Sequence, residues 1–184
     1  IQHSVSLIRP YFDAIGIEVQ PMEQPDYELL IRSGVDSLSL YQECYHPESY
    51  DKYHITGKKK QFRYRLDAPD KGAQAGFYRI HLGALLGLYD WRYECIALAW
   101  HLRYLQKRYW QTHYGLSFPR INDFSGDFQI DYPVSELELQ QIICAFRLCF
   151  PDLNLTLSTR EPAAFRDQLI HMGVTSMSAE SATE

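Results

Sequence analysis

Apolar and polar positions along the chain follow two spacings, one typical of strands and one typical of helices. Alternating apolar residues predict strands near 17–20, 36–41, 77–82, 115–119, 153–158 and 174–178. Apolar residues three and four apart predict helices near 2–14, 24–33, 59–75, 90–110, 135–149 and 162–172. The polar segments near 45–58 and 120–133 predict loops, the first with a helical turn. Such regular alternation is typical of parallel, right-handed βα units.

Three of the predicted strands run directly into clusters of polar residues. These clusters occupy residues 41–46, 119–120 and 158–162. Parallel strands end at the same edge of a sheet, and α/β folds build their active sites at that edge. The clusters therefore predict a functional site at the carboxyl ends of the strands.

The alternation within individual strands distinguishes a barrel from a doubly wound sheet. Polar residues recur at every second position of two predicted strands: Glu18 and Gln20 on the first, and Asn154, Thr156, Ser158 and Arg160 on the fifth. A polar inner face on several strands favours a barrel with a wet cavity over a dry doubly wound core. We therefore predict an α/β fold, a partial (β/α) barrel of the TIM type with about six parallel βα units, in one domain over residues 1–184.

Composition and charge narrow the class of protein. The formal net charge is -5, so no overall basic field attracts nucleic acid or an anionic membrane. No apolar stretch is long enough to span a bilayer, and the start lacks the features of a secretory leader. The four cysteines are scattered without a zinc or cluster motif, which is typical of reduced thiols. These features predict a cytoplasmic protein without a nucleic-acid or membrane partner.

Charged and amide side chains at the strand ends are the candidates for ligand binding. Arg120 and Arg160 each follow a strand, and the arginine fork suits a bidentate grip on a carboxylate. A structural pair with a glutamate such as Glu161 is the alternative. Gln42 and Glu43 can hold ligand hydroxyls or an ammonium group, although an ordinary solvated loop has the same composition.

Eight segments, taken in order, carry a resemblance to a known family. They are Ile17–Pro21, Tyr41–His46, Gly57–Lys59, Arg65–Asp70, Leu82–Leu88, Asp90–Arg92, Ser117–Arg120 and Leu157–Glu161. With this order and spacing the chain resembles the 2-iminoacetate synthases (ThiH), tyrosine lyases of thiamine biosynthesis in the radical S-adenosylmethionine (SAM) superfamily. HydG, the tyrosine lyase of hydrogenase maturation, shares the Tyr-His-Pro-Glu and Ser-Thr-Arg-Glu patterns and is the alternative within the superfamily.

The resemblance implies a fold, a reaction and cofactors. The chain would be the later portion of a radical SAM barrel, roughly strands three to eight. The family's CxxxCxxC segment, which holds a [4Fe–4S] cluster, has no counterpart in this sequence. We therefore expect an incomplete part of the enzyme that is inactive alone. The implied reaction cleaves the tyrosine Cα–Cβ bond through a radical generated from SAM, giving 2-iminoacetate and p-cresol. Thiazole synthase and a reducing electron donor are the implied partners.

Residue by residue, the resemblance also implies a SAM site. Gln42 and Glu43 would contact SAM from the end of their strand, and Arg65 would grip its carboxylate. The adenine would lie against the backbone of Leu82 and Gly83, where a glycine allows close approach. Two further residues, Phe118 and Pro119, would help to line it. No catalytic side chain and no metal ligand is assigned within this chain.

The tyrosine site is the second implied site. Ser158 and Arg160 would hold the tyrosine α-carboxylate by bidentate pairing. Arg120 is the alternative for either carboxylate. A different class of function is a non-catalytic barrel module that has lost its cluster segment and binds a nucleoside, an amino acid or a protein partner.

Overall fold

One parallel sheet organises the chain in the computed structural model, which describes residues 1–121 and 129–179. Each strand pairs in parallel with the next one in the sequence. The strands are β1 (Gly16–Glu18), β2 (Ser37–Glu43), β3 (Arg79–Ala84), β4 (His113–Ser117), β5 (Asn154–Leu157) and β6 (Ser176–Met177). The prediction of six parallel strands separated by helices is confirmed.

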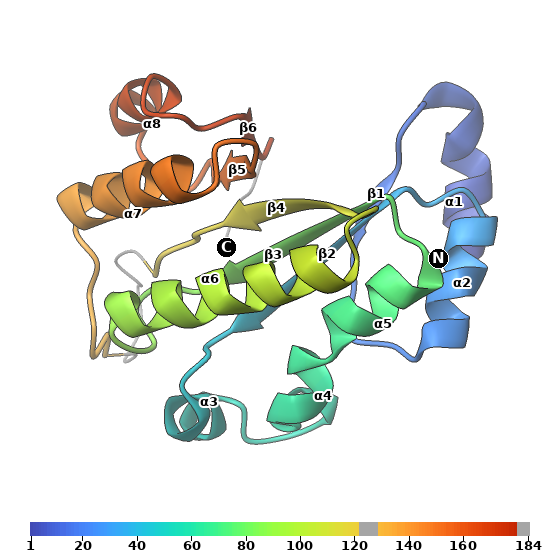
Figure 1. Cartoon of the computed structure of the whole chain (residues 1–184), viewed down its shortest axis with the longest axis horizontal. Coiled ribbons are helices and arrows are strands. Elements are labelled where there is room, and N and C mark those ends of the chain that lie inside the picture. The colour runs from blue at the N-terminus through green and yellow to red at the C-terminus, as the bar shows by residue number, and fades with distance from the viewer. Residues whose placement is uncertain (122–128, 180–184) are drawn as a thin grey trace.

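A barrel and a doubly wound sheet, the two fold classes compared from the sequence, differ in the order of their strands. The sheet runs β1-β2-β3-β4-β5-β6 without a reversal. A doubly wound sheet reverses its strand order at a switch point, whereas a barrel adds each strand beside the previous one. The sheet is therefore an open sector of a (β/α) barrel (Figure 1).

Helices connect the strands, and α5, α6 and α7 lie along one face of the sheet (Figure 1). Two short 3₁₀ turns, η1 (Arg9–Tyr11) and η2 (Lys58–Lys60), accompany them. The helices are α1 (Gln2–Ile8), α2 (Gln24–Arg32), α3 (Pro47–Tyr53), α4 (Phe62–Leu66), α5 (Ala68–Ala75), α6 (Trp91–Arg108), α7 (Glu136–Cys149) and α8 (Ala163–Ile170).

The helices begin and end at local sequence signals, and the prediction overlooked one of these signals, Pro69. Ser135 and Glu138 form a capping box at the start of α7, whose helix was predicted near 135–149. The prediction of one helix over 59–75 is wrong, because this segment forms η2, α4 and α5 in succession. Pro69 lies in the first turn of α5, where its missing N–H costs nothing, so it starts a new helix. Pro10 similarly interrupts the predicted helix 2–14.

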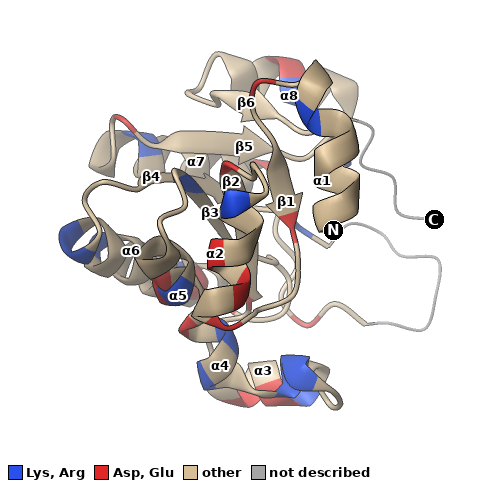
Figure 2. Cartoon of the chain, turned by 90° about the vertical axis from the view of Figure 1, so that its right-hand side faces the viewer, with Lys and Arg blue, Asp and Glu red and all other residues tan. Residues whose placement is uncertain are grey.

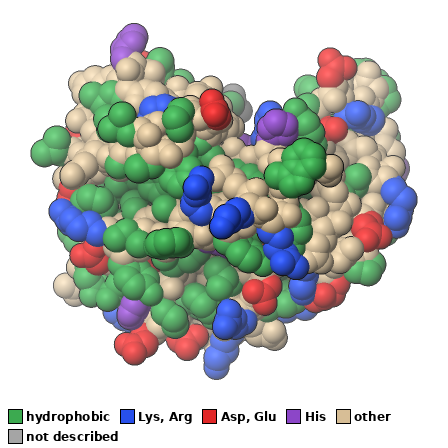
Figure 3. Space-filling view, viewed as in Figure 1, with side chains coloured by type: hydrophobic (Ala, Val, Ile, Leu, Met, Phe, Trp, Pro, Cys, Tyr) green, Lys and Arg blue, Asp and Glu red, His purple; other side chains and the backbone are tan. Residues whose placement is uncertain are grey.

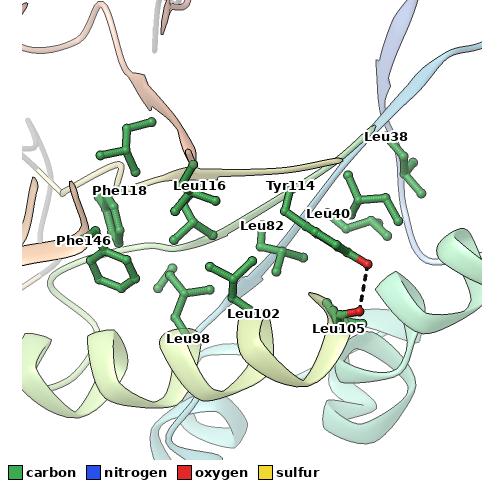
Figure 4. Close-up of a cluster of buried hydrophobic side chains, with 14 of the residues drawn as sticks. Leu38, Leu40, Leu82, Leu98, Leu102, Leu105, Tyr114, Leu116, Phe118 and Phe146 are labelled. Atoms are coloured by element: carbon green, nitrogen blue, oxygen red, sulfur yellow. Dashed lines mark hydrogen bonds between the residues drawn. The ribbon is translucent and has the colours of Figure 1, made fainter. Parts of the chain in front are cut away.

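Leucine side chains fill the space between the sheet and the helices (Figure 4). Leu82 and Leu116 point from β3 and β4 towards Leu98 and Leu102 of α6 (Figure 4), and all four are at most 1% exposed. Burying each leucine contributes about 1.5–3 kcal/mol. This core fixes which face of each strand is left for the barrel interior.

The outer surface carries charges of both signs. Figure 2 shows acidic and basic residues intermixed over α3, α4 and α5. Hydrophobic side chains lie over α6 and α7 in Figure 3, and Trp100 and Leu148 are 73% and 81% exposed. Exposed hydrophobic residues are common on protein surfaces and assign no function by themselves. Within the described ranges, no helix is both long and apolar enough to cross a membrane.

Candidate active site

The face of the sheet opposite the leucine core is polar. Strand register places residues of the same face in rows across the sheet. One row is Tyr41, Gly83, Ser117, Thr156 and Ser176. The row beneath it is Glu18, Ser39, His81, Gly115 and Asn154. The prediction of a polar barrel interior is thereby confirmed, including the shared face of Asn154 and Thr156.

Two glycines allow rings from the neighbouring strand to lie across the sheet. A Cβ atom on Gly83 would lie 2.5 Å from Cδ1 of Tyr41 and 2.7 Å from the carbonyl oxygen of Ser117. A Cβ atom on Gly115 would lie 2.4 Å from Nδ1 of His81. Burial lowers the pKa of His81. These two rings fill the lower part of the barrel interior.

A cavity of about 220 Å³ opens above the rings, at the edge where the polar clusters predicted a site. Four residues named from the sequence line it: Glu43, Pro119, Ser158 and Arg160. The sequence also placed Glu18 and Thr156 on the polar inner face of the barrel. It assigned no role to the remaining lining residues, which are Tyr41, Leu85, Ser117, Leu157 and Ser178. Tyr41 and Ser117 could have been found from the alternation of the two faces along each strand, since both occupy positions that face the barrel interior.

Arg65 and Glu43 form an ion pair beside the cavity. Glu43 follows a β-bulge and has φ 71°, which turns its carboxylate away from the regular strand register. Nη2 of Arg65 donates to Oε1 of Glu43 at 2.9 Å, and Nε donates to the carbonyl of Tyr41 at 2.6 Å. Nη1 of Arg65 is buried and has no hydrogen-bond partner among the described residues. An unpaired buried guanidinium nitrogen fits an anionic ligand group.

Gln42 lies apart from its neighbour Glu43. It belongs to the buried set of β2 with Leu38 and Leu40, and it is only 4% exposed. Both polar atoms of its amide lack a hydrogen-bond partner within the described chain, and the residue does not line the cavity. A contact between Gln42 and SAM therefore stays a prediction, and its unpaired amide is the feature that supports it.

Of the four residues expected around adenine, Pro119 lines the cavity and Leu82, Gly83 and Phe118 do not. The side chain of Leu82 packs in the core against α6. The ring of Phe118 packs on Phe146, with centroids 4.8 Å apart. Pro119 lines the cavity, and its carbonyl accepts a hydrogen bond from the backbone N–H of Leu86 at 2.8 Å. Only Pro119 among these residues brings a side chain to the cavity.

Arg120 is occupied by a buried glutamate. Its Nε and Nη2 donate to the two carboxylate oxygens of Glu161 at 2.8 and 2.5 Å, and its Nη1 donates to the carbonyl of Val134. The side chains of Arg120 and Glu161 are 9% and 3% exposed. Hydrogen bonding to Glu161 raises the pKa of Arg120. All three guanidinium nitrogens of Arg120 are hydrogen-bonded within the protein. Arg120 therefore forms the structural pair with a glutamate that was the alternative to ligand binding.

Ser158 and Arg160 stand at the mouth of the cavity. The backbone N–H of Arg160 donates to Oγ of Ser158 at 3.2 Å, which shapes the turn after β5. The guanidinium of Arg160 is exposed and makes no ion pair with any described residue. Glu161, the residue after Arg160, is fixed by Arg120. Arg160 is thus the arginine that is free to meet a carboxylate in the cavity.

A buried carboxylate that sequence reasoning missed holds the segment after β2. Glu94 of α6 is 0% exposed and accepts hydrogen bonds from the backbone N–H groups of Tyr45 and His46 at 2.6 and 3.2 Å. The thiol of Cys44 donates to the same carboxylate at 3.2 Å. Burial raises the pKa of Glu94. These contacts fix the chain next to Glu43.

In residues 1–121 and 129–179, no three His, Cys, Asp or Glu side chains cluster so as to hold a metal ion. Cys44 is buried beneath Glu94, and Cys144 and Cys149 are exposed on α7. We assign no metal ligand to these residues.

Solved structures that are similar to this chain define the class of fold. The crystal structure of HydG, a maturase of the [FeFe]-hydrogenase, matches with a TM-score of 0.91 and 28% identity over 100% of this chain and 42% of that chain. HydG from Carboxydothermus hydrogenoformans matches with a TM-score of 0.83 and 32% identity over 98% of this chain and 44% of that chain. Methylornithine synthase (PylB) shares the fold at 20% identity, with a TM-score of 0.73 over 96% and 50% of the two chains. The predicted partial (β/α) barrel of the radical SAM type is confirmed.

Comparisons of sequence are more specific. The chain is 44% identical to the 2-iminoacetate synthase of Salmonella typhimurium and 42% identical to that of Escherichia coli, in both cases over 178 residues and 96% of this chain. Residues 117–184 match the Biotin and Thiamin Synthesis associated domain. The predicted resemblance to the 2-iminoacetate synthases is confirmed. The chain spans about half the length of these relatives, 47% in both cases.

Proposed function

We propose that the protein is a radical SAM tyrosine lyase of the 2-iminoacetate synthase type. It would cleave the Cα–Cβ bond of tyrosine to give 2-iminoacetate and p-cresol, for assembly of the thiamine thiazole. The observation that carries the proposal is a cavity lined by Arg160 and by Glu43, which pairs with a second arginine, Arg65, in a chain 42–44% identical to 2-iminoacetate synthases. Two amino-acid carboxylates, one from SAM and one from tyrosine, need two arginine sites.

The Arg65 side of the cavity suits SAM. Glu43 and the Tyr41 carbonyl hold the guanidinium in place, and Nη1 is left to meet a carboxylate. The carboxylate of Glu43 also accepts hydrogen bonds from hydroxyl or ammonium groups. These features support the carry-over of SAM contacts to Glu43 and Arg65, whereas the ring of Tyr41 fills the space over Gly83.

The Arg160 side suits the carboxylate of tyrosine. Arg160 and Ser158 line the same cavity as Glu43 but come from the turn after β5, whereas Glu43 comes from β2. The Arg120–Glu161 pair ties the turn after β5 to the end of β4, so the position of Arg160 depends on buried contacts at its neighbour. Preorganised charge of this kind orients a substrate for reaction.

The chain's own residues would bind and orient, and the cofactors would supply the chemistry. When bound, SAM and a [4Fe–4S] cluster provide the radical that removes hydrogen from the substrate amino group. The residues of this chain hold the two amino acids in register and exclude water from the reacting groups. We propose that residues 1–184 form one domain, the later portion of the barrel. Thiazole synthase and a reducing electron donor are the proposed partners.

A HydG-type lyase is the second candidate, and one observation favours it. The structural match to HydG, with a TM-score of 0.91, covers the whole chain. The sequence identity of 28–32% is lower than the 42–44% to the 2-iminoacetate synthases. The 2-iminoacetate synthase function is therefore the better supported of the two.

An assay of products tests the proposal. The whole protein, reconstituted anaerobically with iron and sulfide, is incubated with SAM, a reductant and tyrosine. We expect p-cresol and 5′-deoxyadenosine in equal amounts, with glyoxylate from hydrolysis of 2-iminoacetate. A loaded protein that cleaves SAM and yields no p-cresol from tyrosine would refute the function. Complementation of a thiamine-requiring strain then separates the thiamine role from the HydG-type alternative.

A further inference from the structure

Tyr41 builds the floor of the cavity. Its ring extends from β2 across Gly83 of β3, in the space that a side chain on Gly83 would occupy. Ser117 of β4 lies in the same row of the sheet as Tyr41 and Gly83, on the other side of Gly83 from Tyr41. The ring therefore covers the interior of two neighbouring strands and closes the cavity from below.

The mouth and the floor of the cavity differ in chemistry. Ser158 and Arg160 provide a positive anchor at the mouth. Thr156 lies two residues earlier on the same strand, in the row that contains Tyr41 and Ser117. Two residues of a strand span roughly 7 Å. A hydroxyl-rich floor thus lies below the anchor at a depth similar to the length of an aromatic amino acid.

The remaining lining supports the same orientation of a ligand. Leu85, Pro119 and Leu157 supply apolar surface to the cavity. Thr156 already shares a hydrogen bond with Ser176 at 2.8 Å, so its hydroxyl is partly used. Burial raises the pKa of the Tyr41 phenol, which keeps its hydroxyl protonated and able to donate or accept. The floor hydroxyl best placed to meet a ligand is that of Tyr41.

We propose that Tyr41 is a specificity-determining residue that receives the para-hydroxyl group of the substrate ring. This inference rests on the proposed tyrosine lyase function and adds the group that recognises the phenol. With the carboxylate held by Arg160, the ring of the substrate extends between the apolar lining residues towards the floor. The Tyr41 hydroxyl then distinguishes tyrosine from phenylalanine, because a buried polar group left without its partner lowers affinity for the analogue.

Substitution of Tyr41 by phenylalanine isolates the hydroxyl and keeps the ring over Gly83. Dissociation constants of L-tyrosine and L-phenylalanine are measured by equilibrium dialysis on the reconstituted whole protein with SAM present. The preference of the wild type for tyrosine should fall about 10-fold in Tyr41→Phe, while SAM binding is unchanged. The matched control is Tyr114→Phe, because Tyr114 lies on the opposite face of the sheet and bonds to the carbonyl of Leu105.

The ratio of the two dissociation constants separates a specific role from a structural one. Damage to the fold weakens binding of both amino acids and leaves their ratio unchanged. A wild-type protein that prefers tyrosine, with a Tyr41→Phe variant that retains this preference, would overturn the inference and leave the proposed function standing. A wild type without any preference for tyrosine would overturn both.

Discussion

The guanidinium of Arg65 bridges the Glu43 carboxylate, at 2.9 Å, and the Tyr41 carbonyl, at 2.6 Å, and its Nη1 remains buried without a partner in the described chain. Two of the three guanidinium nitrogens thus hold the side chain in place, and the third donates to no acceptor within the described residues. A buried donor without a partner costs about 1–3 kcal/mol, which binding of an anionic group would recover.

The first prediction concerns this unpaired nitrogen. Arg65→Lys keeps the positive charge near Glu43 but removes the fork that reaches a second acceptor. We expect the dissociation constant for SAM to rise about 10-fold or more, measured by equilibrium dialysis. The same substitution at Arg63, an exposed residue of the same helix, is the control. Equal SAM affinity in the Arg65 and Arg63 variants would remove Arg65 from the site.

The second prediction concerns the buried pair of Arg120 and Glu161. Arg120→Ala leaves an unpaired carboxylate that is 3% exposed, so the free energy of unfolding should fall by about 3–5 kcal/mol. Urea denaturation measures this loss. The double variant Arg120→Met with Glu161→Leu should recover most of the stability, because no buried charge remains. A loss below about 1 kcal/mol in the single variant would show that the pair is not buried as described.

The third prediction is a dependence of stability on pH at His101. Burial lowers the pKa of His101 to about 4, although Asp70 and Asp67 oppose the shift, and its Nδ1 lies 2.9 Å from the Tyr45 hydroxyl. The unfolded chain takes up this proton near pH 6.5, the ordinary value, and the folded chain only near pH 4. The contribution is therefore fully present above pH 6.5 and is lost as the pH falls towards 4.

His101→Gln removes this titration. The free energy of unfolding of the variant should vary less between pH 6.5 and 4, by roughly 1–3 kcal/mol, than that of the wild type. Chemical denaturation at several pH values measures both curves, with His3→Gln on the exposed part of α1 as the control. Parallel curves for the wild type and the His101 variant would contradict the burial of this imidazole.

The fourth prediction concerns the close approach at Gly83. Gly83→Ala would place a Cβ atom 2.5 Å from the Tyr41 ring and 2.7 Å from the Ser117 carbonyl oxygen. The ring can rotate, but the backbone oxygen cannot move cheaply, so we expect a loss of about 1–3 kcal/mol in stability. Thermal denaturation of the wild type and the variant measures this loss, and equal stability of the two would contradict the close approach at Gly83.

Strand and helix periodicity predicted the topology well, because each strand is buried on one face and polar on the other. The same alternation along the strands could have identified Tyr41 and Ser117 as site residues, because both lie on the face of the sheet that forms the predicted site. The break between α4 and α5 could also have been predicted from the sequence, since Pro69 cannot lie inside a continuous helix. Local rules therefore account for the fold and for part of the cavity.

The partners of the charged side chains could not be predicted from order along the chain. Glu161 is adjacent to Arg160 in the sequence, yet its carboxylate pairs with Arg120, which lies 41 residues away. Two arginines that end parallel strands look alike until the turns that carry them are placed in space. Glu94 gave no signal either, because its three hydrogen-bond donors follow a strand about 50 residues earlier.

Binding of tyrosine and of SAM to the Arg160→Ala variant is the measurement that tests the account most directly. The central claim is that the tyrosine carboxylate lies at Arg160, apart from the SAM carboxylate at Arg65. We predict weaker tyrosine binding by about 2–4 kcal/mol in the reconstituted whole protein, with SAM binding nearly unchanged. Arg32→Ala, an exposed arginine of α2, should alter neither affinity. Unchanged tyrosine binding, or an equal loss of both ligands, would contradict the claim.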